Sequence, residues 1–92
     1  MVKIKRHGKF DQMLEKLCNT DEEIHQLVEE RIIWFQRNPN DTRLRNHVLT
    51  KSMEGKWAFS ITGDIRIIYE WKNKTTVRFL TIGPHTTVYK KN

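Results

Sequence analysis

The spacing of apolar residues predicts a short strand and then an amphipathic helix at the start of the chain. Val2 and Ile4 alternate with lysines, which is the period-two pattern of a strand. The apolar residues that follow are spaced i, i+3, i+4 and i+7, which places them on one face of a helix. These residues are Phe10, Met13, Leu14 and Leu17.

A second helical stripe begins after a short break. Thr20 and Glu23 have the spacing of a capping box, so we expect Thr20 to cap the N-terminus of this helix. The sequence Arg-Asn-Pro-Asn at 37–40 predicts its end, because a residue that precedes proline disfavours helical geometry. The apolar residues of the stripe are Ile24, Leu27, Val28, Ile32 and Phe35.

The second half of the chain changes to a period of two, which is typical of strands. Residues 41–55 carry no such pattern, and we interpret them as a loop or a short turn segment. Alternation in the segment that follows puts Trp57, Phe59 and Ile61 on one face. The Gly-Pro pair at 83–84 is expected to break the strand before it. The predicted strands cover residues 56–61, 65–71, 76–82 and 85–90, with turns at 62–64 and 73–74.

This order of elements predicts an α+β fold. At 92 residues the chain has room for one hydrophobic core, so residues 1–92 should form a single domain. We expect an N-terminal strand and two helices packed on one face of a mainly antiparallel, twisted sheet of four to five strands. The other face of the sheet would then be open, and its side chains would be available for binding.

The strand predicted at 65–71 places a candidate ligand on the open face. Ile65, Ile67 and Tyr69 share one parity and suit the core, so Arg66 belongs to the other side. We therefore expect Arg66 to project from the middle of the open face. A guanidinium there is either a phosphate ligand, because it can bind phosphate through a bidentate fork, or a solubilising side chain.

The charge of the chain favours a polyanionic or acidic partner. There are 17 Lys and Arg against 11 Asp and Glu, which gives a net charge of +6. Residues 1–45 carry nine basic and eight acidic side chains, whereas residues 46–92 carry eight basic and three acidic ones. The surplus is therefore in the predicted sheet. Charge alone does not choose between RNA and an acidic protein.

Several other classes of protein are disfavoured by the composition. Cys18 is the only cysteine, so an internal disulfide is excluded and no thiolate metal site is indicated. The first ten residues have charge but no apolar segment of the kind found in signal peptides. No apolar run approaches the roughly 20 residues that a membrane span needs. We expect a cytoplasmic protein without membrane contact.

Two of the four histidines are candidates for chemistry. His25 is within the second predicted helix and His7 is in a turn before the first, and both are expected to be structural or solvated. His47 and His85 are predicted in loops at the edges of the sheet, where a rigid scaffold often positions reactive groups. No His or Cys spacing supports a metal site, so acid–base chemistry is favoured and no metal or cofactor is expected.

The polar residues of the second half could support RNA cleavage without a metal. This reaction needs a base for the 2′-hydroxyl proton, an acid for the leaving 5′-oxygen and a cation near the phosphoryl oxygens. His47, Asp64, Arg66 and His85 are the side chains available for these roles. Tyr89 adds a ring that could stack on a base.

Two segments, residues 43–71 and 77–89, resemble the RelE/ParE toxin superfamily, and most of all its YafQ-like branch. The shared features occur in a fixed order over roughly residues 35–90. They are a helix-ending N-P, then N-H-x-L, G-x-W, G-D-x-R-x-I-Y, and finally I-G-x-H with an aromatic residue four positions later.

This resemblance implies a ribosome-dependent endoribonuclease that cuts mRNA in the ribosomal A site. It further implies a cognate acidic antitoxin that silences the toxin in a hetero-oligomer. By the same resemblance His85 would be the general acid, and His47 or Asp64 would be the base or its orienting partner. Arg66 would stabilise the phosphate and Tyr89 would position the base.

We also expect four basic residues of the second half to contact RNA. They are Lys51, Lys56, Arg78 and Lys90.

The sequence departs from the YafQ-like pattern in two places, which leaves two alternatives open. YafQ-like members have a further histidine before the aspartate, where this chain has Ser60, Ile61 and Thr62. They also have tryptophan after the aspartate, where this chain has Ile65. The alternatives are a ParE-like toxin that inhibits DNA gyrase and a catalytically degenerate module that only binds an antitoxin.

Overall fold

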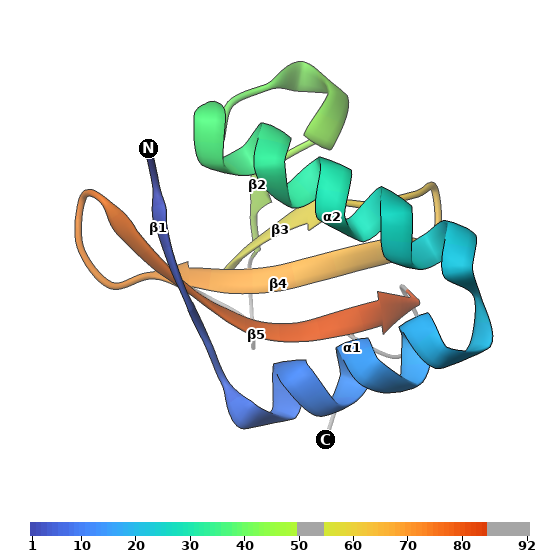
Figure 1. Ribbon diagram of the computed structural model, residues 1–92. Helices are drawn as coiled ribbons and strands as arrows, with labels where there is room; N and C mark the ends of the chain where they lie inside the picture. Colours follow the sequence, from blue (N-terminus) through green and yellow to red (C-terminus); the bar gives the residue numbers. More distant parts are fainter. Residues whose placement is uncertain (50–54, 85–92) are drawn as a thin grey trace.

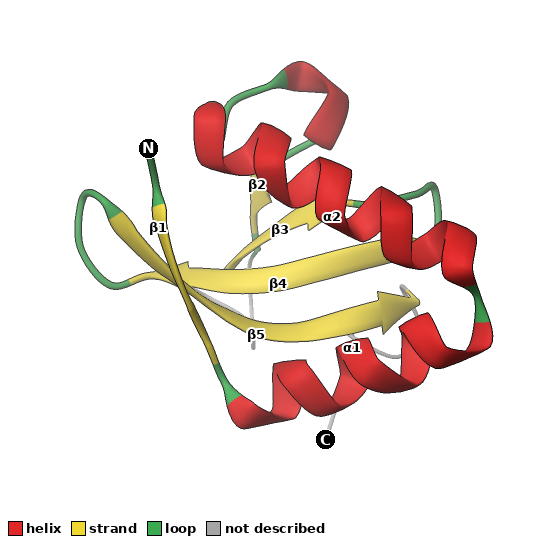
Figure 2. Cartoon of the chain, in the orientation of Figure 1, coloured by secondary structure: helices red, strands yellow, loops and turns green. Residues whose placement is uncertain are grey.

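The described residues form a five-stranded sheet with two helices packed on one side of it (Figure 1). The computed structural model describes residues 1–49 and 55–84. The elements are β1 (Lys3–Arg6), α1 (Gly8–Thr20), α2 (Glu22–Arg37), the short 3-10 helix η1 (Thr42–Leu44), β2 (His47–Val48), β3 (Trp57–Ser60), β4 (Ile65–Trp71) and β5 (Thr76–Pro84). The strand order is β1-β5-β4-β3-β2, and only β1 and β5 are parallel (Figure 2). The predicted α+β class is confirmed.

Asp21, and not the predicted Thr20, caps the second helix. Asp21 is extended between the two helices, and its carboxylate accepts hydrogen bonds from the backbone N–H groups of Glu23 (3.0 Å) and Ile24 (3.4 Å). Thr20 is the last residue of α1, where its hydroxyl donates to the backbone carbonyl of Leu17 (2.9 Å). The prediction for Thr20 was wrong because α1 runs one turn further than the apolar pattern indicated, so the next extended residue takes the capping position.

A cluster of aromatic rings forms the centre of the core, and each ring comes from a different element. Phe35 of α2 stacks on Phe59 of β3 with ring centroids 4.5 Å apart. It also meets Tyr69 of β4 edge-on at 4.9 Å. Phe10 of α1 packs against Phe79 of β5 at 5.2 Å. All five residues are fully buried, so this cluster fixes both helices to the three central strands.

A bulge in β5 changes which of its residues face the core. Tyr69 pairs with Phe79 and Ile68 pairs with Thr81, so Leu80 is an extra residue without a partner in β4. Phe79 and Ile82 both lie in the core although they are three residues apart. Strict alternation along this strand therefore holds only up to Phe79.

The predicted strand break at 83–84 is also wrong. Gly83 pairs with Arg66 and Pro84 with Ile65, so β5 continues to its last described residue. Proline has no N–H to donate and is tolerated where a strand has a free edge. The pairing of β1 with β5 stops at Phe79, so the end of β5 has β4 as its single described neighbour.

The sheet's far edge is formed by a strand that the sequence did not predict. Residues 41–55 were interpreted as a loop, yet β2 lies within them and pairs His47 with Ala58 of β3. A two-residue strand is too short to show a period in the sequence. The strand predicted at 85–90 lies outside the described residues.

The face of the sheet opposite the helices is not open at its centre. Ala58 and Ile68 point to this side, and both are fully buried. Met13, Leu49 and Leu80 pack against them as a second, smaller apolar cluster. The expectation of an open face therefore holds for the ends of the strands but not for their middle.

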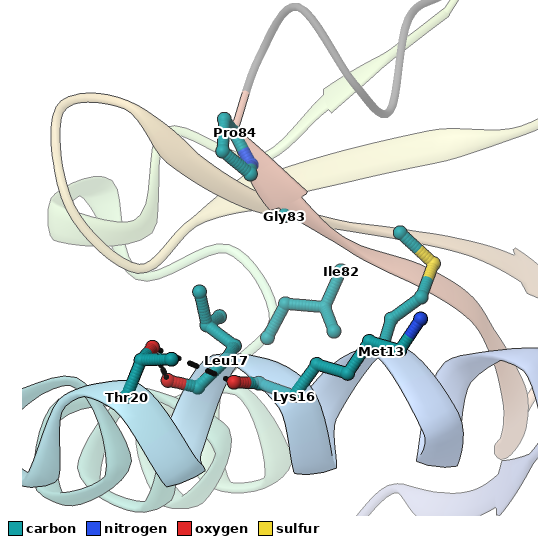
Figure 3. Close-up of a pocket in the computed structure, with 7 residues that line it drawn as sticks. All are labelled: Met13, Lys16, Leu17, Thr20, Ile82, Gly83 and Pro84. Carbon is teal, nitrogen blue, oxygen red and sulfur yellow. Dashed lines mark hydrogen bonds between the residues drawn. The ribbon is translucent and has the colours of Figure 1, made fainter.

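A shallow apolar cavity lies between α1 and the end of β5 (Figure 3). Its volume is about 380 Å³. The residues that line it are Met13, Lys16, Leu17, Thr20, Ile82, Gly83 and Pro84.

Within the described residues, neither helix combines the length and the apolar character needed to span a membrane.

Tyr69 connects the core to the segment that precedes β2. Its phenolic hydroxyl donates to Asn46 Oδ1 at 2.6 Å. Burial raises the pKa of Tyr69 to about 12. The phenol therefore stays neutral and acts as a donor at pH values well below 12.

We expect Asp21→Ala to lower the free energy of unfolding by about 1 kcal/mol, because two backbone N–H groups lose their acceptor. Thr20→Val should lower it by less than about 0.5 kcal/mol, since the end of α1 remains exposed to water. Urea denaturation followed by circular dichroism measures both values. A larger loss for Thr20→Val than for Asp21→Ala would contradict this assignment of the cap.

Tyr69→Phe should destabilise the fold by about 1 kcal/mol at pH 9, because the half-buried Asn46 loses its donor. Raising the pH from 10 to 12 should reduce the difference in free energy of unfolding between the wild type and Tyr69→Phe. The folded wild type holds the phenolic proton up to a pKa of about 12, while the unfolded chain releases it near 10.0 and is favoured by doing so. Thermal melting of both proteins at pH 9 and pH 11.5 tests this, and a constant difference would count against it.

Candidate active site

Arg66 lies on the face of the sheet opposite the helices, as predicted. Ile65 and Ile67 belong to the core between sheet and helices, so alternation turns Arg66 to the other face. The predicted place in the middle of that face is wrong. Arg66 is the second residue of β4, and Ile68 has the central position. Arg66 is therefore at one end of the face, beside the turn at 61–64.

Two backbone carbonyls hold the guanidinium of Arg66 near this turn. Its Nη1 donates to the carbonyl oxygens of Gly63 (3.2 Å) and Asp64 (3.4 Å). Within the described residues, Nη1 is the only nitrogen of the Arg66 side chain that donates a hydrogen bond. The Nε and Nη2 groups can therefore donate to an anion that approaches the face.

His47 is exposed on the edge strand β2, and its ring is held by a main-chain contact. Its Nδ1 lies 2.9 Å from the carbonyl oxygen of Arg45. A carbonyl oxygen can only accept, so Nδ1 carries the proton in the neutral ring and Nε2 has the free lone pair. This tautomer suits a general base, because the lone pair of Nε2 is available to accept a proton.

His47 and Arg66 share a face but are two strands apart. His47 pairs with Ala58 of β3, and Arg66 pairs with Ser60 of the same strand. Standard strand spacings put their Cα atoms about 10 Å apart across the sheet and about 7 Å apart along it. A substrate lying over β3 would have the imidazole on one side and the guanidinium on the other.

Asp64 is exposed in the turn that leads into β4. The hydroxyl of Thr62 accepts hydrogen bonds from the backbone N–H groups of Asp64 (3.2 Å) and Ile65 (3.0 Å), which fixes the turn. Arg66 contacts the backbone carbonyl of Asp64, and the ion pairs among the described residues do not include its carboxylate. The predicted role of Asp64 as base or orienting partner remains a prediction.

The predicted RNA-binding lysines and arginine are only partly described. Arg78 lies on the face opposite the helices, where its Nη1 is 3.8 Å from Glu70 Oε2. Lys56 directly precedes β3 and is half-buried. Lys51 and Lys90 lie outside the described residues.

The other two predicted catalytic residues, His85 and Tyr89, also lie outside the described residues. His85 follows Pro84 in the sequence, and Pro84 pairs with Ile65 next to Arg66. Within residues 1–49 and 55–84 there is no group of three His, Cys, Asp or Glu side chains that could hold a metal ion.

Asn46 also belongs to the site, although the sequence indicated it only as the first residue of the N-H-x-L motif. Its side chain accepts the Tyr69 hydroxyl, and it lies between Arg45 and His47 in the chain. This contact ties the backbone that positions the His47 ring to the core. The available signal was the hydroxyl of Tyr69, because a buried tyrosine nearly always needs a hydrogen-bond partner.

Solved structures of bacterial toxins have the same fold as this chain. YafQ from E. coli strain BL21(DE3) matches with a TM-score of 0.79 and 19% identity, over 97% of this chain and 99% of that one. A YoeB/ParE toxin from Agrobacterium tumefaciens matches with a TM-score of 0.77 and 19% identity, over 91% and 99% of the two chains. The E. coli DinJ–YafQ complex contains a chain that matches with a TM-score of 0.70 and 21% identity, over 97% and 99%.

The search of curated proteins gives no match. The family model described as the YafQ bacterial toxin of type II toxin–antitoxin systems matches residues 2–90. The match extends over every described strand and helix, including the positions of His47 and Arg66. The chain therefore belongs to the YafQ family of bacterial toxins of type II toxin–antitoxin systems.

Proposed function

We propose that this toxin is a metal-independent endoribonuclease that cuts mRNA in the ribosomal A site. The observation that carries the proposal is the placement of His47 and Arg66 on the same face of the sheet, on either side of β3. A base and a phosphate ligand in this arrangement are two of the three groups that cleavage requires.

Cleavage would begin with proton transfer from the ribose 2′-hydroxyl to Nε2 of His47. The 2′-oxygen then attacks the neighbouring phosphorus, and the bond from phosphorus to the 5′-oxygen breaks. The products are a 2′,3′-cyclic phosphate and a free 5′-hydroxyl. His85, which the family resemblance assigns as the acid, would supply the proton that the leaving oxygen takes up.

Arg66 would bind the phosphate while negative charge gathers on its oxygens. The carbonyls of Gly63 and Asp64 hold one guanidinium nitrogen, so the other two can donate to a phosphate with little loss of side-chain freedom. Tyr89 would stack on a base next to the cut, as the resemblance implies. Asp64 would orient the base or share its role.

An acidic antitoxin is the proposed protein partner. A solved structure of the E. coli DinJ–YafQ toxin–antitoxin complex contains a chain of this fold. In this chain Lys5 of β1 and Arg78 of β5 are in register on the face opposite the helices, and Glu70 offsets one of their two positive charges. An acidic segment that covers this face would mask the charge and block access to Arg66 in the same hetero-oligomer.

His47→Gln should slow mRNA cutting by about 10²–10⁴-fold, because the amide cannot accept the 2′-hydroxyl proton as imidazole does. Arg66→Gln should slow it by about 10²–10³-fold through loss of the phosphate ligand. Primer extension on mRNA from a translation extract measures the cuts, and induced expression in bacteria reports growth arrest.

Arg37→Gln is the matched control, because it removes one exposed charge at the end of α2, away from the sheet face. It should cut like the wild type. Undiminished cutting by His47→Gln and Arg66→Gln would rule out the proposed roles. Gyrase-dependent DNA breaks without mRNA cuts would support the gyrase-directed alternative, and absence of any toxicity would support a degenerate antitoxin-binding module.

A further inference from the structure

Three arginines surround a polar cavity at the edge of the candidate active site. Arg31 reaches it from α2, Arg43 from η1, and Arg45 from the residue that follows η1. The end of β3 and the turn that follows it, residues 60–63, complete the lining. The cavity has a volume of about 240 Å³. The proposed cleavage uses none of these three side chains, although the backbone carbonyl of Arg45 contacts the ring of His47.

The side chain of Trp34 holds two of these guanidinium groups together. The Cζ atom of Arg31 is 4.1 Å from the centre of the indole, and that of Arg43 is 3.6 Å from it. Arg43 is fixed further by Asp41, with distances of 3.0 Å from Nε to Oδ1 and 2.7 Å from Nη2 to Oδ2. Both guanidinium groups are thus fixed against the same indole, which reduces the entropy that they lose when an anion binds.

The charges around the cavity are not balanced within the described residues. Arg31 pairs with Glu30, and Arg43 pairs with Asp41. Arg45 has no carboxylate partner among the described ion pairs, so three cations face two anions. One positive charge remains, which matches a single phosphodiester or a single carboxylate. Both paired arginines also keep unused N–H groups that could donate to it.

The cavity adjoins the place assigned to the scissile phosphate. The carbonyl of Gly63, which lines the cavity, accepts a hydrogen bond from Arg66 Nη1 at 3.2 Å. Ser60 lines the cavity too and pairs with Arg66 across the sheet. The cavity therefore lies at the end of β3, where Gly63 connects it to Arg66, and Arg31 of α2 reaches it from the helix side of the sheet.

We infer that Arg31, Arg43 and Arg45 form a second phosphate-binding site, which holds an RNA backbone phosphate next to the one being cut. This inference rests on the proposed endoribonuclease function. RNA is favoured over an acidic protein segment because its phosphates repeat along one chain and can occupy both sites at once. Planar guanidinium groups also match phosphate oxygens through two parallel hydrogen bonds.

Arg45→Gln is the decisive variant, because the side chain is exposed and removing it disturbs no pair within the described residues. The probe is a fluorescently labelled, fully 2′-O-methylated RNA of twelve nucleotides, which cannot be cut through a 2′-hydroxyl. Fluorescence anisotropy over a series of salt concentrations gives the affinity and its salt dependence. Arg37→Gln again serves as the control of equal charge.

Arg45→Gln should weaken RNA binding about tenfold. For this variant the magnitude of the slope of log affinity against log salt concentration should fall by about 0.7, the value for one contact to a phosphate of a single strand. Arg45→Lys should recover the slope but only part of the affinity, because it keeps the charge and loses the fork. Equal affinity and slope for Arg45→Gln and Arg37→Gln would overturn the inference.

Two further measurements separate this inference from the proposed function. The binding assay does not depend on cleavage, because the methylated RNA has no free 2′-hydroxyl. If the wild type cuts no RNA but the Arg45→Gln effect persists, the nuclease proposal fails and the phosphate site stands. If Arg45→Gln weakens binding of a twelve-residue glutamate peptide and leaves RNA binding unchanged, the site is one for an acidic protein and the inference is wrong.

Discussion

The stacking of Phe35 on Phe59 is the contact on which the rest of the structure depends. A chain of 92 residues has little apolar surface to bury, and here one helix ring is placed directly over the central part of the sheet. Tyr69 and Phe79 surround this pair edge-on and connect β4 and β5 to it. Because the rings fix the helices to one face of the sheet, the strand residues of opposite parity, including Arg66, lie on the other face.

The hydroxyl of Tyr69 connects this core to the candidate active site. The Tyr69 ring belongs to the aromatic cluster, while its hydroxyl binds Asn46 just before β2. The carbonyl of Arg45, one residue earlier, orients the ring of His47. The edge strand is only two residues long, so this chain of contacts supplies the rigidity that its backbone pairing alone cannot.

Where a pattern in the sequence spans several residues, it predicted the structure correctly. The parity of Ile65, Ile67 and Tyr69 placed Arg66 on the right face, and the amphipathic stripes located both helices. The errors concern features set by one or two residues. A capping residue depends on the backbone angles where one helix ends, and Thr20 and Asp21 are both chemically suited to the role. The bulge at Leu80 exists because of packing on both faces of β5, which no local alternation encodes.

The parallel pairing of β1 with β5 has a consequence for the order of folding. Lys3 and Arg6 find their partners at Thr76 and Phe79, more than seventy residues later in the chain. During synthesis the first strand therefore has no partner until residues 76–79 have been made. Contacts this distant in sequence slow folding, since the loop between them must close first. A nascent chain therefore lacks its complete sheet until β5 has been synthesised.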